Sequence, residues 1–393
     1  MKNVIFRLFI IAFLALYVQL IQAEELIWHG FAAQGVIQSA DSNFVNDDGA
    51  ISLSLTEVGM NTSYRISNKL RVSAQGVYIN GGNRYDEGLH IDYLFLDYQL
   101  LNSNNWQLNV NLGRYKNYHW LYSSTRDVPH TMPTNVLPQS IYFDALRHIS
   151  LGSDGISMAA HNLNSFGEWD FRWSYGQSKI TRRQTVNILS ELATGRLSHD
   201  YDTQMSVAFR PLGSGASVGL SVLDDTFTYT AGEGDRFIDT KANIQRIMLN
   251  FSLSGEYWEV NAEFLRERIK ASTVVPEIVT SDTFSEGAYL QGQYFVSPTF
   301  TLLARADIFD LDVKDRSGIA RETSSGGYIP RYFGYMDLAT VAAAWDFSSN
   351  WRVRAEYHRV KGRARLAPLF VADLVTNDSE YWDIWAVQVI YWF

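Results

Sequence analysis

The 393-residue chain contains no cysteine, and this absence excludes several classes of protein. Without thiols there is no disulfide framework, no zinc–thiolate site and no iron–sulfur cluster. Basic residues are also scarce, because 33 lysines and arginines stand against 42 acidic residues, for a net charge of -9. A nucleic-acid partner would favour a basic surface, so we expect none. Apolar residues make up 46% of the chain, which is enough to bury a core.

Long apolar runs are absent after residue 23, so the sequence offers no candidate transmembrane helix beyond that point. The first 23 residues have a different character. Lys2 and Arg7 precede an apolar run from Leu8 to Val18, and Ala23 closes the segment. This order is typical of a secretory signal peptide, and the run is short for an uncleaved membrane anchor. We therefore expect residues 1–23 to be removed on export and residues 24–393 to form one domain.

The rest of the sequence alternates apolar and polar residues with a period of two. Trp106–Leu112, Phe300–Ile308 and Trp351–Tyr357 show the alternation most clearly. Successive side chains of a strand point to opposite faces, so each segment predicts a strand with one apolar and one polar face. Sixteen such segments are present, near residues 26–38, 50–66, 69–80, 88–101, 105–115, 151–162, 168–180, 199–211, 216–230, 240–254, 256–270, 283–297, 299–313, 334–347, 350–362 and 380–393.

The gaps between these segments are alternately short and long. Turn residues fill the short gaps, as in Ser67–Lys69 and Ser254-Gly255. The gaps that alternate with these turns are many residues long. A β-sandwich has no reason for this alternation, but a membrane barrel has short periplasmic turns and long outer loops. The sequence thus predicts an all-β fold, a transmembrane antiparallel β-barrel of about 16 strands. We place it in the outer membrane of a Gram-negative cell, in contact with lipid and lipopolysaccharide.

The C-terminus supports the same interpretation. Apolar and aromatic residues alternate from Trp385 through Tyr391 to the final Phe393. This pattern resembles the last strand of Gram-negative outer-membrane barrels. The resemblance implies that Tyr391 and Phe393 form the signal read by the outer-membrane barrel assembly machinery.

The longest gap, Lys116 to Ser150, follows the fifth predicted strand and spans 35 residues. Loops of this length without regular structure are uncommon unless they are functional. A sixteen-stranded barrel is too wide for its own side chains to fill, so something must narrow it. We predict that residues 116–150 fold into the lumen as a constriction loop.

Barrel size and loop placement resemble the sixteen-stranded general porins of Gram-negative bacteria. Trp28–Ala32, Gly113–Lys116, Thr125–Asp127 and Leu137–Tyr142 resemble more narrowly an uncharacterised porin-like family, distantly related to phosphate-selective porins. The chain departs from that family pattern at Tyr118, Trp120 and Met132. The resemblance implies a homotrimer that passes small hydrophilic solutes by passive diffusion.

A porin selects solutes by pore radius and by charges on its lumen wall and constriction. Arginines in a narrow pore would attract carboxylate, phosphate or sulfate groups. Alternatively, inward-facing carboxylates such as Asp97, Glu259 and Glu263 could pair with them and leave a neutral wall. Both interpretations remain open, and an anion preference is a hypothesis. The candidate constriction and lumen residues are Arg114, Lys116, Arg126, Asp127, Arg172, Arg305, Asp307, Arg352, Arg354, Glu356 and His358.

Three other functions fit a membrane barrel. A channel for hydrophobic or aromatic compounds would want an apolar lumen and an N-terminal plug, and a structural or adhesive barrel would not conduct. An enzyme barrel would need a nucleophile or acid pair beside histidine, and the sequence shows no nucleophile elbow and no His-Glu-x-x-His motif. We expect no catalytic residues, no cofactor and no resident metal.

Overall fold

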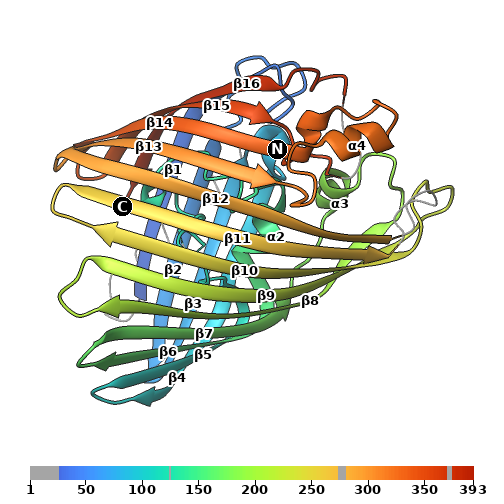
Figure 1. The fold of residues 1–393 in the computed structure, drawn as a ribbon. Helices are drawn as coiled ribbons and strands as arrows, with labels where there is room; N and C mark the ends of the chain where they lie inside the picture. The colour runs from blue at the N-terminus through green and yellow to red at the C-terminus, as the bar shows by residue number, and fades with distance from the viewer. Residues whose placement is uncertain (1–25, 124, 273–279, 370–373) are drawn as a thin grey trace, which may run out of the picture.

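The computed structural model describes residues 26–393 except 124, 273–279 and 370–373, so the predicted signal peptide lies outside the described residues. Sixteen strands within this part of the chain form one closed antiparallel sheet, in which β1 pairs with β16 (Figure 1). The prediction of a sixteen-stranded barrel is confirmed. The strands are β1 (Leu26–Ala40), β2 (Thr56–Ser67), β3 (Leu70–Asn80), β4 (Gly88–Asn102), β5 (Trp106–Lys116), β6 (Gly152–Asn164), β7 (Gly167–Gln177), β8 (Arg196–Pro211), β9 (Ala216–Thr230), β10 (Thr240–Ser254), β11 (Trp258–Ser272), β12 (Thr280–Ser297), β13 (Phe300–Asp310), β14 (Tyr335–Ser348), β15 (Trp351–Gly362) and β16 (Tyr381–Trp392).

Short turns gather at one end of the barrel and long loops at the other (Figure 1). Short helices interrupt the long loops, and α3 begins at a capping box in which the Thr181 side chain accepts from the Gln184 backbone N–H. No helix in the described ranges is long and apolar enough to cross a membrane. The helical elements are η1 (Gly82–Arg84), η2 (Pro129–Thr131), η3 (Asp144–Leu146), α2 (Arg147–Leu151), α3 (Arg182–Ile188), α4 (Ile319–Ser324) and η4 (Arg331–Gly334).

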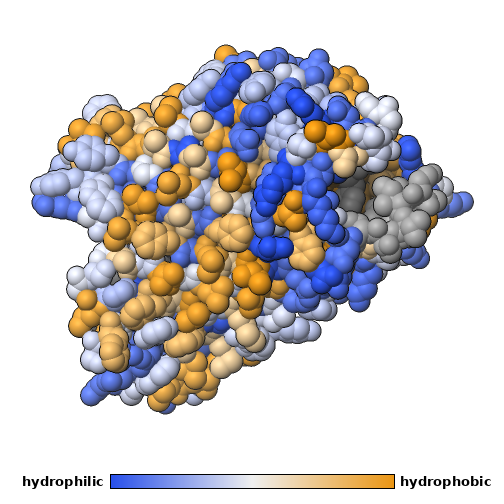
Figure 2. Space-filling model, in the orientation of Figure 1, coloured by the Kyte–Doolittle hydropathy of each residue, from blue (hydrophilic) through white to orange (hydrophobic). Residues whose placement is uncertain are grey.

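The alternation along each strand separates two faces. On β13, Leu302 and Ile308 are exposed on the outside, whereas Arg305 and Asp307 between them are buried and face inward. Apolar side chains cover the strands on the visible face, and hydrophilic residues gather over the loop-bearing end around α4 (Figure 2). An apolar outer band with a polar interior is the pattern of a membrane barrel.

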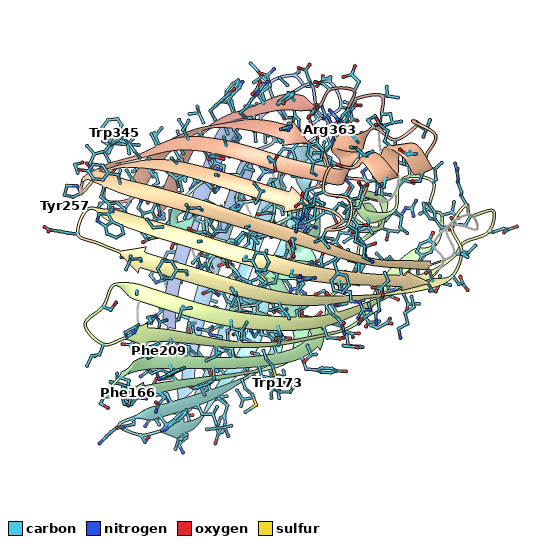
Figure 3. All side chains as sticks on the ribbon, in the orientation of Figure 1. Phe166, Trp173, Phe209, Tyr257, Trp345 and Arg363 are labelled. Atoms are coloured by element: carbon cyan, nitrogen blue, oxygen red, sulfur yellow. The ribbon has the colours of Figure 1, made fainter. Side chains whose placement is uncertain are left out.

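Aromatic side chains mark the end with the short turns. Phe166, Tyr257 and Trp345 are exposed there and point away from the barrel (Figure 3). Such residues suit the interface between lipid and water. Trp382 does not belong to this set, because it is buried inside the barrel with its indole N–H on the Gly362 carbonyl.

The seam between β1 and β16 closes at the C-terminus. The backbone of Phe393 pairs with Gly30 in both directions, at N···O distances of 3.0 and 3.2 Å. The Phe393 ring lies over Gly30 and meets Trp28 edge-on at 5.3 Å. A Cβ on Gly30 would approach this ring to 2.5 Å, so a larger residue would force the ring to shift. The role of Tyr391 and Phe393 as an assembly signal stays a prediction.

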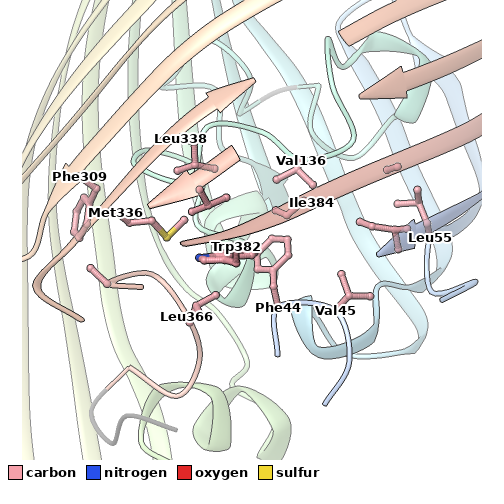
Figure 4. Packing of buried hydrophobic residues seen from close by; sticks show 14 residues of the cluster. Phe44, Val45, Leu55, Val136, Phe309, Met336, Leu338, Leu366, Trp382 and Ile384 are labelled. Carbon is pink, nitrogen blue, oxygen red and sulfur yellow. The ribbon is translucent and has the colours of Figure 1, made fainter. Parts of the chain in front are cut away.

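Part of the barrel interior is a hydrophobic core rather than open space. Inward residues of β1 and β13–β16 pack against three loops (Figure 4). Phe44 and Val45 come from the loop after β1, Val136 from the loop after β5, and Leu366 from the loop after β15. These contacts bury apolar area and thereby hold the loops inside the barrel.

Candidate functional site: the constriction loop and the lumen walls

The loop between β5 and β6, residues 117–151, folds into the barrel as the sequence predicts. We call it the constriction loop. Its apolar residues pack on the inner faces of β9–β12, where Leu223, Met248, Leu265 and Tyr289 are buried. The loop residues in this cluster are Trp120, Met132, Leu137, Ile141 and Tyr142.

Arginines on β13 and β15, which follow β9–β12 around the barrel, also hold the loop. Arg354 is fully buried, and its Nη1 donates to the carbonyls of Pro129 and Met132 at 3.3 and 2.5 Å. Arg305 donates to the Thr134 hydroxyl and the Val136 carbonyl, both at 2.9 Å. Guanidinium groups that donate to the loop in this way hold it in place as tethers, and their donors are not available to a passing solute.

Carboxylates of the same wall accept from loop N–H groups. Glu356 receives the backbone N–H groups of Asn135 and Val136 at 2.6 and 2.9 Å. On β11, Glu263 receives the Leu121 backbone N–H at 3.1 Å and the Tyr142 hydroxyl at 2.6 Å. Both carboxylates are buried, and charge-assisted hydrogen bonds of this kind are the strong ones.

We call this surface the anchoring wall, and it holds several of the predicted lumen residues. His358 is buried between Glu356 and the Thr340 hydroxyl, at 3.0 and 2.8 Å. Asp307 is buried on β13. Arg352 forms a two-point ion pair with Asp346 and also donates to the His130 carbonyl at 2.8 Å. The anchoring wall is defined by Glu263, Arg305, Asp307, Arg352, Arg354, Glu356 and His358.

A buried charge network folds the loop on itself. Asp144 accepts from Arg126 at 2.9 Å and from Arg84 of η1 at 2.8 Å. Burial alone would raise the pKa of Asp144, but the two guanidinium groups lower it below the usual value. Lys116 pairs with Asp127 at 2.7 Å, and Gln75 of β3 donates to the same carboxylate at 2.8 Å.

The prediction that Arg114 lines the lumen is wrong. Arg114 shares its face of β5 with the exposed Leu112 and pairs in register with the exposed Leu94. It reaches Asp154, half exposed on β6, at 3.5 Å. Side-chain direction flips at every residue of a strand, and Arg114 falls on the outward set.

The remaining predicted residue, Arg172 of β7, faces inward, and its role in the lumen stays a prediction. Its guanidinium lies 4.9 Å above the ring of Tyr118 in the constriction loop. The described residues form no ion pair with it. Its strand neighbour Asp170, by contrast, accepts from Arg210 at 2.7 Å and from His161 at 3.1 Å.

Arg172 belongs to a second inner surface, which we call the half-open wall, on β4–β7. Its residues are partly accessible, and the hydrogen bonds of its amides and carboxylates run along the wall, whereas Arg172 contacts the ring of Tyr118. Asn109 donates to Asp97 at 2.6 Å, and Asn111 donates to Ser157 at 3.3 Å. The half-open wall is defined by Asp97, Asn109, Asn111, Asp170 and Arg172.

Three histidines of the constriction loop are held neutral. Burial lowers the pKa of His119 to about 3, of His130 to about 4 and of His148 to about 2, with nearby arginines adding to each shift. His119 lies between the hydroxyls of Ser206 and Ser174, at 2.9 and 3.0 Å. No group of three or more metal-ligating side chains occurs within the ranges that the structure describes.

Comparison with known proteins reveals relatives in fold but not in sequence. No family model and no curated protein sequence matches the chain. Among solved structures, an anion-selective porin from Comamonas acidovorans aligns over 94% of this chain and 99% of its own, at 12% identity and a TM-score of 0.58. The trimer form of the outer-membrane protein OmpT of Vibrio cholerae also aligns over 94% of this chain and 99% of its own, at 10% identity and a TM-score of 0.56.

Salmonella typhi OmpF, solved in complex with daunomycin, aligns over 94% of this chain and 97% of its own, at 12% identity and a TM-score of 0.55. The chain therefore has the fold of the outer-membrane porins. At these identities the likeness shows the fold alone. The proposed distant relation to phosphate-selective porins stays a prediction.

Proposed function

We propose that the protein is an outer-membrane porin through which small hydrophilic solutes diffuse passively. One observation carries this proposal: a loop of 35 residues lies inside a closed barrel, yet the half-open wall opposite the anchoring wall stays polar and partly accessible. The loop leaves the residues of the half-open wall partly accessible, so it narrows a sixteen-stranded barrel without removing its lumen. Solutes would pass between the constriction loop and the half-open wall.

A weak preference for anions is the finer part of the proposal. Arg305 and Arg354 donate to loop carbonyls, so they contribute little to selectivity. On the half-open wall, the Asp170 carboxylate is already occupied by Arg210 and His161, whereas Arg172 has no ion-pair partner in the described part of the chain. Its field in a narrow aqueous passage favours anions.

We further propose that the protein assembles as a homotrimer in the outer membrane after export by its signal peptide. The trimer form of the V. cholerae OmpT structure and the shared fold support this assembly. Native mass spectrometry of the detergent-solubilised protein gives the stoichiometry directly, and a monomer at all concentrations would contradict the trimer.

Planar-bilayer recording tests the channel function. The purified protein should insert as stable conductance steps in potassium chloride, and a salt gradient should give a reversal potential of the sign expected for chloride preference. A correctly folded barrel that never conducts would reject the porin function and favour a structural or gated barrel. A reversal potential of the opposite sign would reject the anion preference alone.

A further inference from the structure

A second feature of the molecule lies at the loop-bearing end, above the constriction loop. Five loops line an open cavity of about 450 Å³ there. The floor comes from Phe143 and Asp144 of the constriction loop, and the sides come from η1, α3 and the loops after β1 and β15. A solute that entered the barrel from this end would meet the cavity before it reached the constriction.

Three buried residues that line the cavity carry hydrogen-bond donors without partners in the described part of the chain. Arg84 uses Nε on Asp144 and Nη2 on the Asn135 carbonyl, and its Nη1 has no partner. Arg365 and Asn187 show the same property at Nε and Nδ2. Arg84, Arg365 and Asn187 are 3%, 6% and 5% exposed, so bulk water does not satisfy these groups.

Buried polar groups in folded proteins are almost always satisfied, and here three residues with unmet donors line one cavity. Each unsatisfied group costs free energy that a bound acceptor would recover. Three carboxylates also line the cavity. Glu191 is exposed, and the other two are engaged elsewhere. Asp144 binds Arg84 and Arg126, and Asp47 accepts from Asn83.

The rest of the lining has two characters. Phe44, Phe143 and Leu366 give the cavity apolar walls. Arg183 adds an exposed positive charge at its edge, where it donates to Asn83 at 2.9 Å. Two or more donors beside an apolar surface are complementary to a molecule with an oxyanion at one end and an apolar body at the other.

We propose that this cavity is a binding site for a small organic carboxylate with an apolar or aromatic body. The oxyanion would accept from Arg84, Arg365 and Asn187, and the body would pack on Phe44, Phe143 and Leu366. The inference rests on the proposed function in that the ligand is a solute of the channel, held at its outer mouth before passage. Inorganic phosphate shares the oxyanion but lacks the apolar body and should bind more weakly.

Titration calorimetry of the detergent-solubilised full-length protein tests the site without any need for conductance. The probes are sodium benzoate, its neutral analogue benzyl alcohol, and inorganic phosphate. We expect benzoate to bind roughly tenfold more tightly than either of the others, because only benzoate matches both the donors and the apolar walls. Equal binding of benzoate and benzyl alcohol, or binding of phosphate alone, would overturn the proposal.

Variants locate the binding. Asn187→Leu removes one unmet donor at nearly constant volume, and Arg183→Gln removes the charge at the edge. Both should weaken benzoate binding severalfold. Arg182→Gln is the matched control, because Arg182 is the neighbouring exposed arginine on α3 and does not line the cavity. An equal loss in Arg182→Gln and Arg183→Gln would show a general effect of surface charge and overturn the site.

The same preparations separate this proposal from the channel function. Benzoate binding by a barrel that does not conduct would reject the porin function and leave the site. Conductance steps with no benzoate binding would reject the site and leave the porin function. Where Asn187→Leu fails to give a folded barrel, the exposed Arg183→Gln variant and its control still decide the question.

Discussion

The two inner walls of the barrel are built from the same kinds of residues but use them differently. On the anchoring wall, charged side chains such as Arg354 and Glu356 are buried and bond to the backbone of the constriction loop. On the half-open wall, Asp97 and Asn109 bond to each other across neighbouring strands and keep partial exposure. A charged residue facing the lumen is thus not by itself a residue of the pore.

The difference places the proposed passage. Residues that the loop covers cannot meet a solute, whereas the half-open wall can. The tethers fix the width of the passage, and Arg172 and its neighbours set the charge along it. Separate substitutions on the two walls should therefore change separate properties of the channel.

The largest effect is expected from cutting a tether. Arg354→Ala would leave the carbonyls of Pro129 and Met132 buried without a donor, at a cost of about 1–3 kcal/mol each. The loop should relax from the wall, and single-channel conductance should rise roughly twofold with added noise, because pore radius governs flow. Bilayer recording measures both.

Arg359→Ala is the control for that variant. Arg359 lies on the same strand but is exposed and pairs with Asp383 at 2.7 Å, an interaction worth about 0–1 kcal/mol. It should conduct as the unmodified protein does. Unchanged conductance in Arg354→Ala would contradict the claim that the anchoring wall sets the width of the passage.

A smaller effect is expected from removing the positive charge of the half-open wall. Arg172→Gln keeps the loop tethers, so conductance should change little. The reversal potential in a salt gradient should move toward that of an unselective pore, because a fixed positive charge is lost from the passage. If Arg172→Gln leaves the reversal potential unchanged and Arg354→Ala shifts it, selectivity belongs to the anchoring wall.

The smallest effect should come from pH. His119, His130 and His148 have pKa values of about 3, 4 and 2, below the ordinary 6.5, so the packed loop keeps them neutral. When the loop is displaced from the wall, its histidines bind protons below about pH 6.5, whereas in the packed loop they stay neutral. The loop is therefore held most stably above that pH, and this stability falls as the pH drops below it. Current noise should be constant from pH 8 to 7 and rise toward pH 5. His130→Gln should reduce that rise, and the exposed His29→Gln should not.

Much of the fold could be predicted from the sequence because its signals are local. Period-two alternation defined the strands, and short turns such as Ser254-Gly255 alternating with long gaps defined the barrel. The length of the gap after β5 predicted a loop inside the lumen, and its packing against β9–β12 confirms this. None of these inferences needed knowledge of distant contacts.

The site was harder to predict because its roles depend on contacts between remote residues. Alternation placed Arg354 on the inward face of its strand, but only the structure shows that the residue binds Met132, 222 positions away. Arg114 was misassigned because it was grouped with the loop after β5, although the alternation through Leu112 places it on the outward face. Asn187 drew no attention, since a single asparagine in a long gap between predicted strands carries no signal for an unmet donor.

The most direct test of the two-wall account uses the absence of cysteine. Single substitutions Asn111→Cys on the half-open wall and Gln291→Cys on the anchoring side can be exposed to a small charged thiol reagent during bilayer recording. The account predicts rapid stepwise loss of current for Asn111→Cys and none for Gln291→Cys, which is fully buried beside the loop. Rapid loss of current for Gln291→Cys, with no loss for Asn111→Cys, would contradict the two-wall account.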